Sequence, residues 1–343
     1  MTAVDPHAGS PSRSGIAHPT ASPVGHPIGD SARGTSAPVS GLSAPTASRT
    51  HPPVGSRLSA VPVADAAAVP NSTPRTRVSA YRRRMLSQQL SERDWRVLDD
   101  LHQHGFLTTA HICGLDFGPH ATADTAARTT RRVLARLARD RLIESLPRRQ
   151  GGPLGGSTPA VWRLTSAGRR IRETHRPALR ALTPTHQRVL HSLAVADLHV
   201  SVRHAAATTD QAVEVALEPT CWRSFHGLGG ERRTVKPDLA ITVHGHDAQG
   251  PYVDRWFIEV DLGTEHLPTL IAKSRAYHEY YLSGSETKDG RAFPLVLWAC
   301  SEEQRVSQLA RAVARTSGLK PQMFRYCTLD QGDDVITGAG ASS

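Results

Sequence analysis

The 343 residues are enough for two ordinary domains and a tail, and the net charge of +10, with a pI near 10.0, favours a polyanionic partner such as nucleic acid. The four cysteines are widely separated and form no Cys-x-x-Cys pair, which argues against a zinc ribbon or a disulfide framework. Because the sequence contains neither a run of apolar residues long enough to span a membrane nor the pattern of a signal peptide, we expect a cytoplasmic protein without membrane contact.

The first 84 residues differ in character from the rest of the chain. They are rich in Pro, Ser, Gly, Thr and Ala, and Tyr81 is their single aromatic residue. Such a segment buries too little apolar surface to offset the entropy of ordering, so we predict a disordered tail over residues 1–84. Its basic end, from Arg75 to Arg84, is interpreted either as a solvated charge run or as a source of non-specific phosphate contacts.

Residues 85–180 have the pattern of a small DNA-binding domain. Apolar periodicity and turn residues predict three helices and then two strands, over residues 90–105, 108–115, 122–141, 142–146 and 160–164. Ser91 can cap the first helix while Asp94 reaches back to it, Gly105 ends that helix, and Thr165 caps a further helix after the strands. Three helices followed by a hairpin predict a winged helix-turn-helix, whose third helix enters the major groove.

The third of these helices carries two faces of different chemistry. Its apolar face includes Val133, Leu134 and Leu137. The opposite face holds five arginines and no carboxylate: Arg128, Arg131, Arg132, Arg136 and Arg139. An ordinary solvated face is the alternative, but such faces usually mix charges of both signs, so we predict contact with double-stranded DNA. Arg148 and Arg149, in the turn of the hairpin, are expected to lie beside the same DNA.

A second domain is predicted over residues 184–330, followed by a flexible C-terminus over 331–343. Its elements follow an α-β-β-β-α-β-α-β order, over residues 186–205, 213–217, 234–243, 256–261, 264–282, 295–300, 302–316 and 323–328. The strand over 295–300 is entirely apolar, which indicates a central place in the sheet.

Three carboxylates fall at the ends of apolar strands in this domain. Asp238 follows Pro237, whereas Glu259 and Asp261 lie two residues apart and project from the same strand face. A lone carboxylate at such a place usually marks a sheet edge or a satisfied hydrogen bond. Three can converge on a hard cation such as Mg²⁺, which serves phosphodiester hydrolysis by binding the phosphate and activating water. We therefore expect Asp238, Glu259 and Asp261 to be metal ligands and catalytic groups.

The Pro-Asp pair that ends at Asp238 and the Glu-Val-Asp run from Glu259 to Asp261, within an αβββαβ order, resemble the PD-(D/E)XK nuclease superfamily. That pattern has Lys where this chain has Asp261. In some members a Lys on the following helix takes its place, and the resemblance points to Lys273 for that catalytic role, with Tyr277 one turn further on.

The span from about Ser91 to Thr316 is similar, more specifically, to the replication-relaxation family of actinobacterial and Gram-positive plasmids and integrative elements. The matching segments are the early Trp-Arg-Val-Leu helix, residues 191–197, 236–238 and 259–265, and Lys273 with Tyr277. The resemblance implies a role in plasmid replication and DNA relaxation, with other plasmid replication or transfer proteins as further partners. His191 and Asp197 are interpreted as surface or capping groups of their helix.

The expected fold class is thus a multidomain α+β and α/β protein, in which a winged helix-turn-helix precedes an αβββαβ restriction-endonuclease-like domain. Two functions stay open. The chain is either a DNA-binding protein whose second domain is a Mg²⁺-dependent nicking endonuclease, or a non-catalytic regulator or replication accessory with an inactive nuclease-like domain. Asp261 in the lysine position favours the second function, whereas Asp238, Glu259 and Lys273 favour the first.

Overall fold

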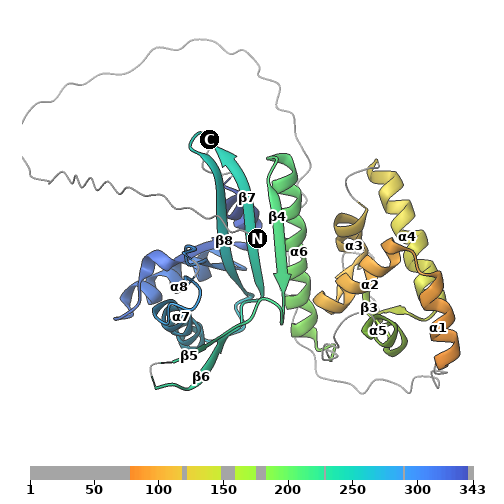
Figure 1. Cartoon of the computed structure of the whole chain (residues 1–343), viewed down its shortest axis with the longest axis horizontal. Coiled ribbons are helices and arrows are strands. Elements are labelled where there is room, and N and C mark those ends of the chain that lie inside the picture. Colours follow the sequence, from red (N-terminus) through yellow and green to blue (C-terminus); the bar gives the residue numbers. More distant parts are fainter. Residues whose placement is uncertain are drawn as a thin grey trace, which may run out of the picture. The chain divides into compact units, whose positions relative to one another are not determined.

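The protein is a mixed α/β fold with a mixed five-stranded sheet, shown in Figure 1. The structure, a computed structural model, describes residues 78–117, 122–147, 159–174, 183–227, 229–288 and 290–338. Residues 1–77 of the tail predicted over 1–84 lie outside the described residues, as does the turn that holds Arg148 and Arg149. No helix in the described part of the chain is both long and apolar enough to cross a membrane.

The described residues between 78 and 174 form what we call the N-terminal module. Its elements are α1 (Ala80–Gln89), α2 (Glu92–His104), β1 (Leu107–Thr108), α3 (Thr109–Asp116), α4 (Ala123–Arg139), β2 (Ile143–Ser145), β3 (Val161–Leu164) and α5 (Ser166–Glu173). The three strands form an antiparallel sheet in the order β1-β3-β2, with Ile143 of β2 opposite Leu164 of β3.

Local capping explains where the helices of this module begin and end. Ser91 accepts a hydrogen bond from the backbone N–H of Asp94, and the Asp94 carboxylate accepts one from the Ser91 N–H at 2.9 Å, so the predicted cap of α2 is confirmed. Gly105 ends α2 at a φ of 79°, a backbone conformation that favours glycine. The side chains of Thr122 and Thr165 cap α4 and α5, because each accepts a hydrogen bond from the backbone N–H three residues further on.

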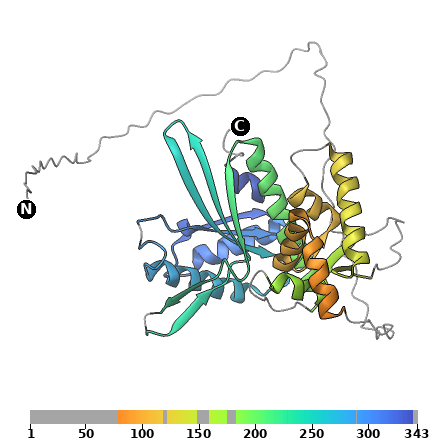
Figure 2. The same cartoon turned by 45° about the vertical axis from the view of Figure 1, so that its right-hand side comes forward.

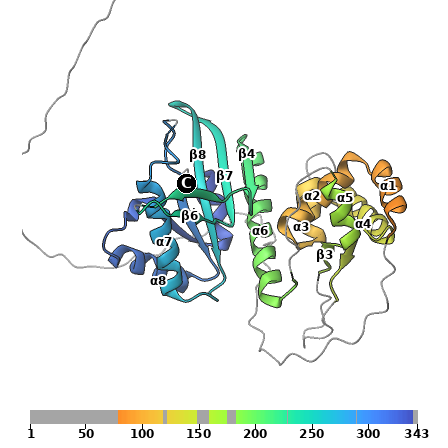
Figure 3. The same ribbon diagram turned by 60° about the horizontal axis from the view of Figure 1, so that its bottom comes forward.

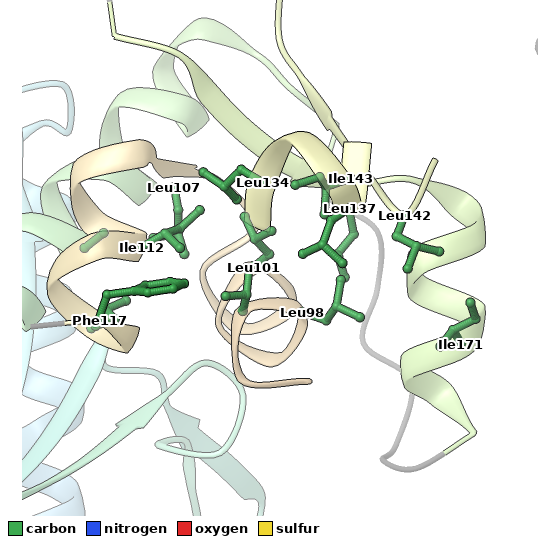
Figure 4. Close-up of a cluster of buried hydrophobic side chains, with 14 of the residues drawn as sticks. Leu98, Leu101, Leu107, Ile112, Phe117, Leu134, Leu137, Leu142, Ile143 and Ile171 are labelled. Carbon is green, nitrogen blue, oxygen red and sulfur yellow. The ribbon is translucent and has the colours of Figure 1, made fainter. Parts of the chain in front are cut away.

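The core of the N-terminal module, drawn in Figure 4, is aliphatic. Leu98 and Leu101 of α2 pack there with Ile112 of α3 and with Leu134 and Leu137 of α4, and each of these side chains is at most 1% exposed. Burying one such side chain contributes about 1.5–3 kcal/mol. The apolar face predicted for the helix over 122–141 therefore anchors α4 and turns its opposite face outward.

Helix α1 begins at Ala80, within the segment 1–84 for which the sequence predicts disorder. Leu86 is 3% exposed, and it joins the core of the N-terminal module together with the partly buried Val78 and Leu90. Val78 belongs to the predicted tail, whereas Leu86 and Leu90 lie just beyond it, so aliphatic side chains on both sides of residue 84 anchor α1 to the core.

The described residues from 183 to 338 form what we call the C-terminal module. Its helices are α6 (His186–Thr208), α7 (Leu267–Leu282), α8 (Glu303–Arg315) and α9 (Gly332–Thr337), with short 3₁₀ turns at Pro321–Met323 and Leu329–Gln331. Its strands are β4 (Ala212–Leu217), β5 (Arg223–His226), β6 (Arg232–Val235), β7 (Leu239–Asp247), β8 (Gly250–Asp261), β9 (Leu295–Cys300) and β10 (Phe324–Thr328). The main sheet has the order β10-β9-β8-β7-β4, and β5 pairs with β6 in a separate hairpin.

Helices cover both faces of the main sheet, as Figure 3 shows for α6 on one side and for α7 and α8 on the other. Strands β4, β7 and β8 are antiparallel, whereas β8, β9 and β10 are parallel. Along β8, Ile258 and Val260 point into the core on the α6 side, and Phe257 points into the core on the side of α7. This alternation directs Glu259 toward α7.

The strand predicted over residues 234–243 is divided in two. Strand β6 ends at Val235 and β7 begins at Leu239, because Pro237 has no N–H for a ladder and the N–H of Asp238 donates to the Ile258 carbonyl at 2.9 Å. The first half pairs with β5, a strand that the sequence analysis does not predict. Figure 2 shows the long β7–β8 hairpin in cyan and the short β5–β6 hairpin below it.

The segment 331–343, predicted to be flexible, contains helix α9. Ile336 is 1% exposed and belongs to the core between the sheet and α6. Gly332 approaches α6 so closely that an added Cβ would lie 2.5 Å from Cδ1 of Leu198. A small amphipathic helix of this length has too few residues for its periodicity to stand out in the sequence.

Candidate active site and nucleic-acid interface

Asp238 lies between β6 and β7 and is hydrogen-bonded to the neighbouring strand β8. The backbone N–H of Val260 donates to Oδ2 of Asp238 at 2.8 Å. Nε2 of His191, on α6, lies 2.9 Å from Oδ1 of the same carboxylate. Burial lowers the pKa of His191, but the hydrogen bond and the charge of Asp238 outweigh burial and raise that pKa above its ordinary value.

Glu259, on β8, is 3% exposed and is bound by two side chains of α7. The hydroxyl of Tyr277 donates to Oε1 at 2.6 Å, and Nζ of Lys273 donates to Oε2 at 3.2 Å. Lys273 and Tyr277 are one helical turn apart, so both reach the same carboxylate. Nζ of Lys273 also lies 3.2 Å from Oε1 of Glu265, which precedes α7.

The charges of these groups influence one another strongly. Burial first, and the nearby charge of Asp238 second, raise the pKa of Glu259 to about 8, although Lys273 and Tyr277 oppose the change. Burial lowers the pKa of Lys273, but Glu259 and Glu265 outweigh burial and raise it above its ordinary value. Lys273 is therefore a cation at neutral pH, and its ammonium group lies between the carboxyl groups of Glu259 and Glu265.

The structure thus brings together Asp238, Glu259 and Lys273, three of the four residues predicted to be catalytic. We call these three residues, with His191 and Tyr277, the acidic cluster. From the sequence His191 is expected to be a surface or capping group, whereas in the structure it lies against Asp238. The signal for it was present, because His191 belongs to the segment that carries the family resemblance.

Glu218 is a further acidic group near the cluster, and the sequence analysis does not single it out. It lies in the turn after β4, and burial, followed by the charge of Asp238, raises its pKa above the ordinary value. Its Oε1 accepts a hydrogen bond from Nε1 of Trp222 at 3.3 Å. An isolated carboxylate in a turn has no periodicity or motif by which it could have been selected from the sequence.

Asp261 is the predicted site residue that the structure does not bring to the cluster. Its carboxylate, 4% exposed, accepts a hydrogen bond from Nε of Arg305, on α8, at 2.5 Å and another from the N–H of Gly263 at 3.0 Å. Glu259 and Asp261 share a strand face, as the alternation predicts, but Asp261 ends β8 and meets α8 instead of α7. Asp261 therefore forms a separate ion pair.

Asp238 and Glu259 are the two residues of the acidic cluster whose carboxylates could hold a divalent cation. Within the described ranges, no group of three or more His, Cys, Asp or Glu side chains is arranged to hold a metal ion. Mg²⁺, however, is often bound through one or two carboxylates, with water and substrate phosphate completing its shell. The charge of Asp238 raises the pKa of Glu259, so a cation between these carboxylates would relieve their repulsion.

Asp197, further along α6, serves the fold. Its Oδ1 lies 2.7 Å from Nε2 of His111, on α3. Ser192, also on α6, donates to the carbonyls of His104 and Phe106. These contacts join α6 to the N-terminal module.

The arginine face of α4 is mostly exposed, as predicted. Arg128, Arg131, Arg132 and Arg139 are exposed to solvent, and none of them forms an ion pair with another residue in the part of the chain that the structure describes. Arg136 differs from these four, because its guanidinium binds the carboxylate of Asp94, which is 0% exposed. Arg136 therefore links α4 to α2 through an ion pair.

Comparison with known proteins adds a family. The family model described as replication-relaxation matches residues 98–296, more than half of the 343 residues. The match includes α4 and every residue of the acidic cluster, whereas Arg305 lies beyond it. No curated protein and no solved structure matches the chain.

Proposed function

Because the chain belongs to the replication-relaxation family, we propose that it binds double-stranded DNA and nicks one strand at the acidic cluster. Family membership indicates a role in the replication or relaxation of plasmid or mobile-element DNA. The observation that carries the nicking function is the convergence of Asp238, Glu259 and Lys273 from three separate segments of the C-terminal module.

The topology of the N-terminal module supports the DNA-binding part of this proposal. Its element order, α2-β1-α3-α4-β2-β3, and its sheet order, β1-β3-β2, suit a winged helix-turn-helix with α4 as the recognition helix. The exposed cations of α4, at Arg128, Arg131, Arg132 and Arg139, then face phosphates and base edges.

The C-terminal module supports the nuclease part by its connectivity. Leaving the β5–β6 hairpin aside, the order α6-β4-β7-β8-α7-β9 is the αβββαβ order that the resemblance to PD-(D/E)XK nucleases implies. Asp238 precedes β7, Glu259 lies near the end of β8, and Lys273 comes from the following helix. The lysine that the resemblance assigns to α7 thus contacts the carboxylate it should accompany.

Each residue of the acidic cluster has a chemical task in this proposal. Asp238 and Glu259 would hold Mg²⁺, which when bound neutralises charge on the scissile phosphate and lowers the pKa of an attacking water. Lys273, a cation at neutral pH, stabilises the negative charge that develops on the phosphate oxygens. Tyr277 orients Glu259 through its hydroxyl, and His191 orients Asp238. These last two are positioning residues.

A second candidate function is a non-catalytic replication accessory or regulator. The placement of Asp261 favours it, since a third carboxylate that binds Arg305 is not available to a metal ion. In that case the C-terminal module serves as a platform for DNA or for other plasmid replication or transfer proteins.

Conversion of supercoiled plasmid to the open-circular form tests the proposal. With Mg²⁺ or Mn²⁺ the wild-type chain should nick the plasmid, and Glu259→Gln should abolish nicking without loss of DNA affinity. Glu214→Gln, which changes an exposed carboxylate of β4, is the matched control and should nick like the wild type. If the wild type binds the plasmid but leaves it supercoiled with both metals, the nicking function is wrong and the accessory function replaces it.

A further inference from the structure

We propose that the outer face of the β5–β6 hairpin is a second DNA-binding surface, which follows the phosphate backbone of the strand that enters the acidic cluster. This inference rests on the proposed function, because the acidic cluster is the place where the bound DNA strand would be cleaved. The hairpin is seen beneath α7 in Figure 1; β5 belongs to none of the elements predicted from the sequence, whereas β6 overlaps the start of the strand predicted over 234–243.

The register of the hairpin separates its side chains into two faces. Ser224 pairs with Thr234 and His226 with Arg232, so these four side chains share one face. Phe225, which pairs with Arg233, belongs to the other face. Because successive residues of a strand alternate, the two faces can have entirely different partners.

The inner face binds the hairpin to the rest of the C-terminal module. Phe225 and Val235 are each 3% exposed and lie in the core that contains α7. The cations of this face have carboxylate partners: Arg233 binds Glu279 of α7, and Nε of Arg223 lies 3.7 Å from Glu286. This face is already occupied by intramolecular contacts, so it is not free to bind a ligand.

The outer face presents hydrogen-bond donors that are not held in close ion pairs, although the charge of Lys236 acts on the pKa of Glu218. Arg232 and Lys236 are exposed, and in the described ranges neither forms an ion pair. The hydroxyls of Ser224 and Thr234, which lie 3.0 Å apart, belong to the same face as Arg232 and Lys236. Arg, Lys, Ser and Thr side chains are the groups that contact phosphate oxygens of DNA. The positive charge and the hydroxyl groups of this face therefore suit a phosphate backbone.

Lys236 continues this face toward the acidic cluster. Its Nζ lies 4.7 Å from the centre of the Trp222 ring, and Trp222 in turn donates to Glu218. Asp238 is two residues further along the chain. Extended chain from Arg232 to Lys236 spans roughly 13 Å, which is the axial length of about four phosphates of one strand. A DNA strand that lies on Arg232 and Lys236 is thus directed at the carboxylates.

The test compares two charge-reversed forms of the full-length chain. Arg232→Glu with Lys236→Glu changes the hairpin, and Arg311→Glu with Arg315→Glu makes the same change in net charge at exposed positions of α8. Affinity for a fluorescent duplex and for a single strand is measured by anisotropy across salt concentrations. The hairpin variant should bind DNA at least about tenfold more weakly. The salt slope, which is the slope of the logarithm of the binding constant against the logarithm of the salt concentration, should fall in magnitude by about 2, or about 1 for each phosphate that the variant no longer neutralises.

A hairpin variant that matches the α8 control in both affinity and salt slope overturns the inference. Thermal melts of both variants show whether each is folded, and the milder Arg232→Gln with Lys236→Gln replaces the reversed pair if that variant is unfolded. Failure of the inference can be told apart from failure of the proposed function. If the wild type does not bind DNA, both fail. If it binds DNA and Arg131→Glu with Arg132→Glu weakens binding while the hairpin variant equals the control, the second surface alone is wrong.

Discussion

Replacing Arg136 by alanine should destabilise the fold, although its position on the arginine face of α4 predicts a loss of DNA binding. The guanidinium of Arg136 binds Asp94, whose carboxylate is completely buried. In the Arg136→Ala variant that carboxylate keeps the hydrogen bonds from the N–H of Ser91, at 2.9 Å, and from its Oγ, at 2.8 Å. It loses its bond to a cation.

The size of the effect follows from the exposure of the two partners. Removing one member of a buried ion pair costs about 3–5 kcal/mol, because the other charge stays buried without compensation. The Arg136 side chain is 40% exposed, and Asp94 retains both Ser91 donors, so solvent screening and these bonds reduce the cost to about 2 kcal/mol. For a folded region of this size, such a loss lowers the Tm by about 4–8 °C.

Urea unfolding followed by far-UV circular dichroism measures this loss, and Arg132→Ala is the matched control. Arg132 is exposed on the same helix, so its replacement should change the free energy of unfolding by no more than about 0.5 kcal/mol while weakening DNA binding. The reasoning is refuted if Arg136→Ala unfolds at the wild-type urea concentration and weakens DNA binding as much as Arg132→Ala does. Arg136 would then be a DNA contact, as the sequence predicts.

Three further changes probe polar groups of the two modules. Burial, and then the charge of Asp100, raise the pKa of Asp116 to about 8. The protonated Asp116 side chain therefore stabilises the folded state at acidic pH, and this stabilisation is lost as the pH rises from about 4 through 8. Asp116→Asn should flatten this decline in urea midpoints measured between pH 5 and 9. Tyr277→Phe removes a hydrogen bond that lowers the pKa of Glu259, so the pH at which nicking reaches half its maximum should rise; an unchanged pH profile would contradict the role of Tyr277 as a positioning residue. Lys273→Gln should abolish nicking and leave anisotropy-measured DNA affinity within about twofold of wild type, since Lys273 is one of many cations that face phosphate; nicking at the wild-type rate would exclude Lys273 from the reaction.

The features that sequence analysis predicts well depend on neighbours in the chain. The cap of α2 requires Ser91 and Asp94, three residues apart, and the buried face of α4 requires the helical spacing of Leu134 and Leu137. The carboxylates of the acidic cluster were found because each stands at the end of an apolar strand. Local spacing fixes all of these without knowledge of the tertiary fold.

The features that it misses depend on contacts between distant segments. Arg136 is 42 residues from Asp94, and Arg305 is 44 residues from Asp261, so no periodicity links either pair. Similarly, the strand over 234–243 is a single β-pattern in the sequence, and its division at Pro237 follows from pairing with β5 and β8. Sequence spacing placed Glu259 and Asp261 on one face, but the two helices above that face determine which partner each carboxylate meets.

The electrostatics of the acidic cluster bear on the choice between the two candidate functions. A scaffold gains nothing from Glu259, because well-packed apolar residues in place of a buried ion pair are often neutral or more stable. The cost is higher here, since the charge of Asp238 adds repulsion that Lys273 only partly offsets. An ion pair that serves stability alone would be balanced, as in the separate pair of Asp261 with Arg305. Around Lys273, by contrast, the two carboxyl groups of the cluster and Glu265 outnumber the cation, and the pKa of Glu259 is raised. A divalent cation held there would offset the cost of ionising Glu259, which accords with the proposed metal site better than with an inert platform.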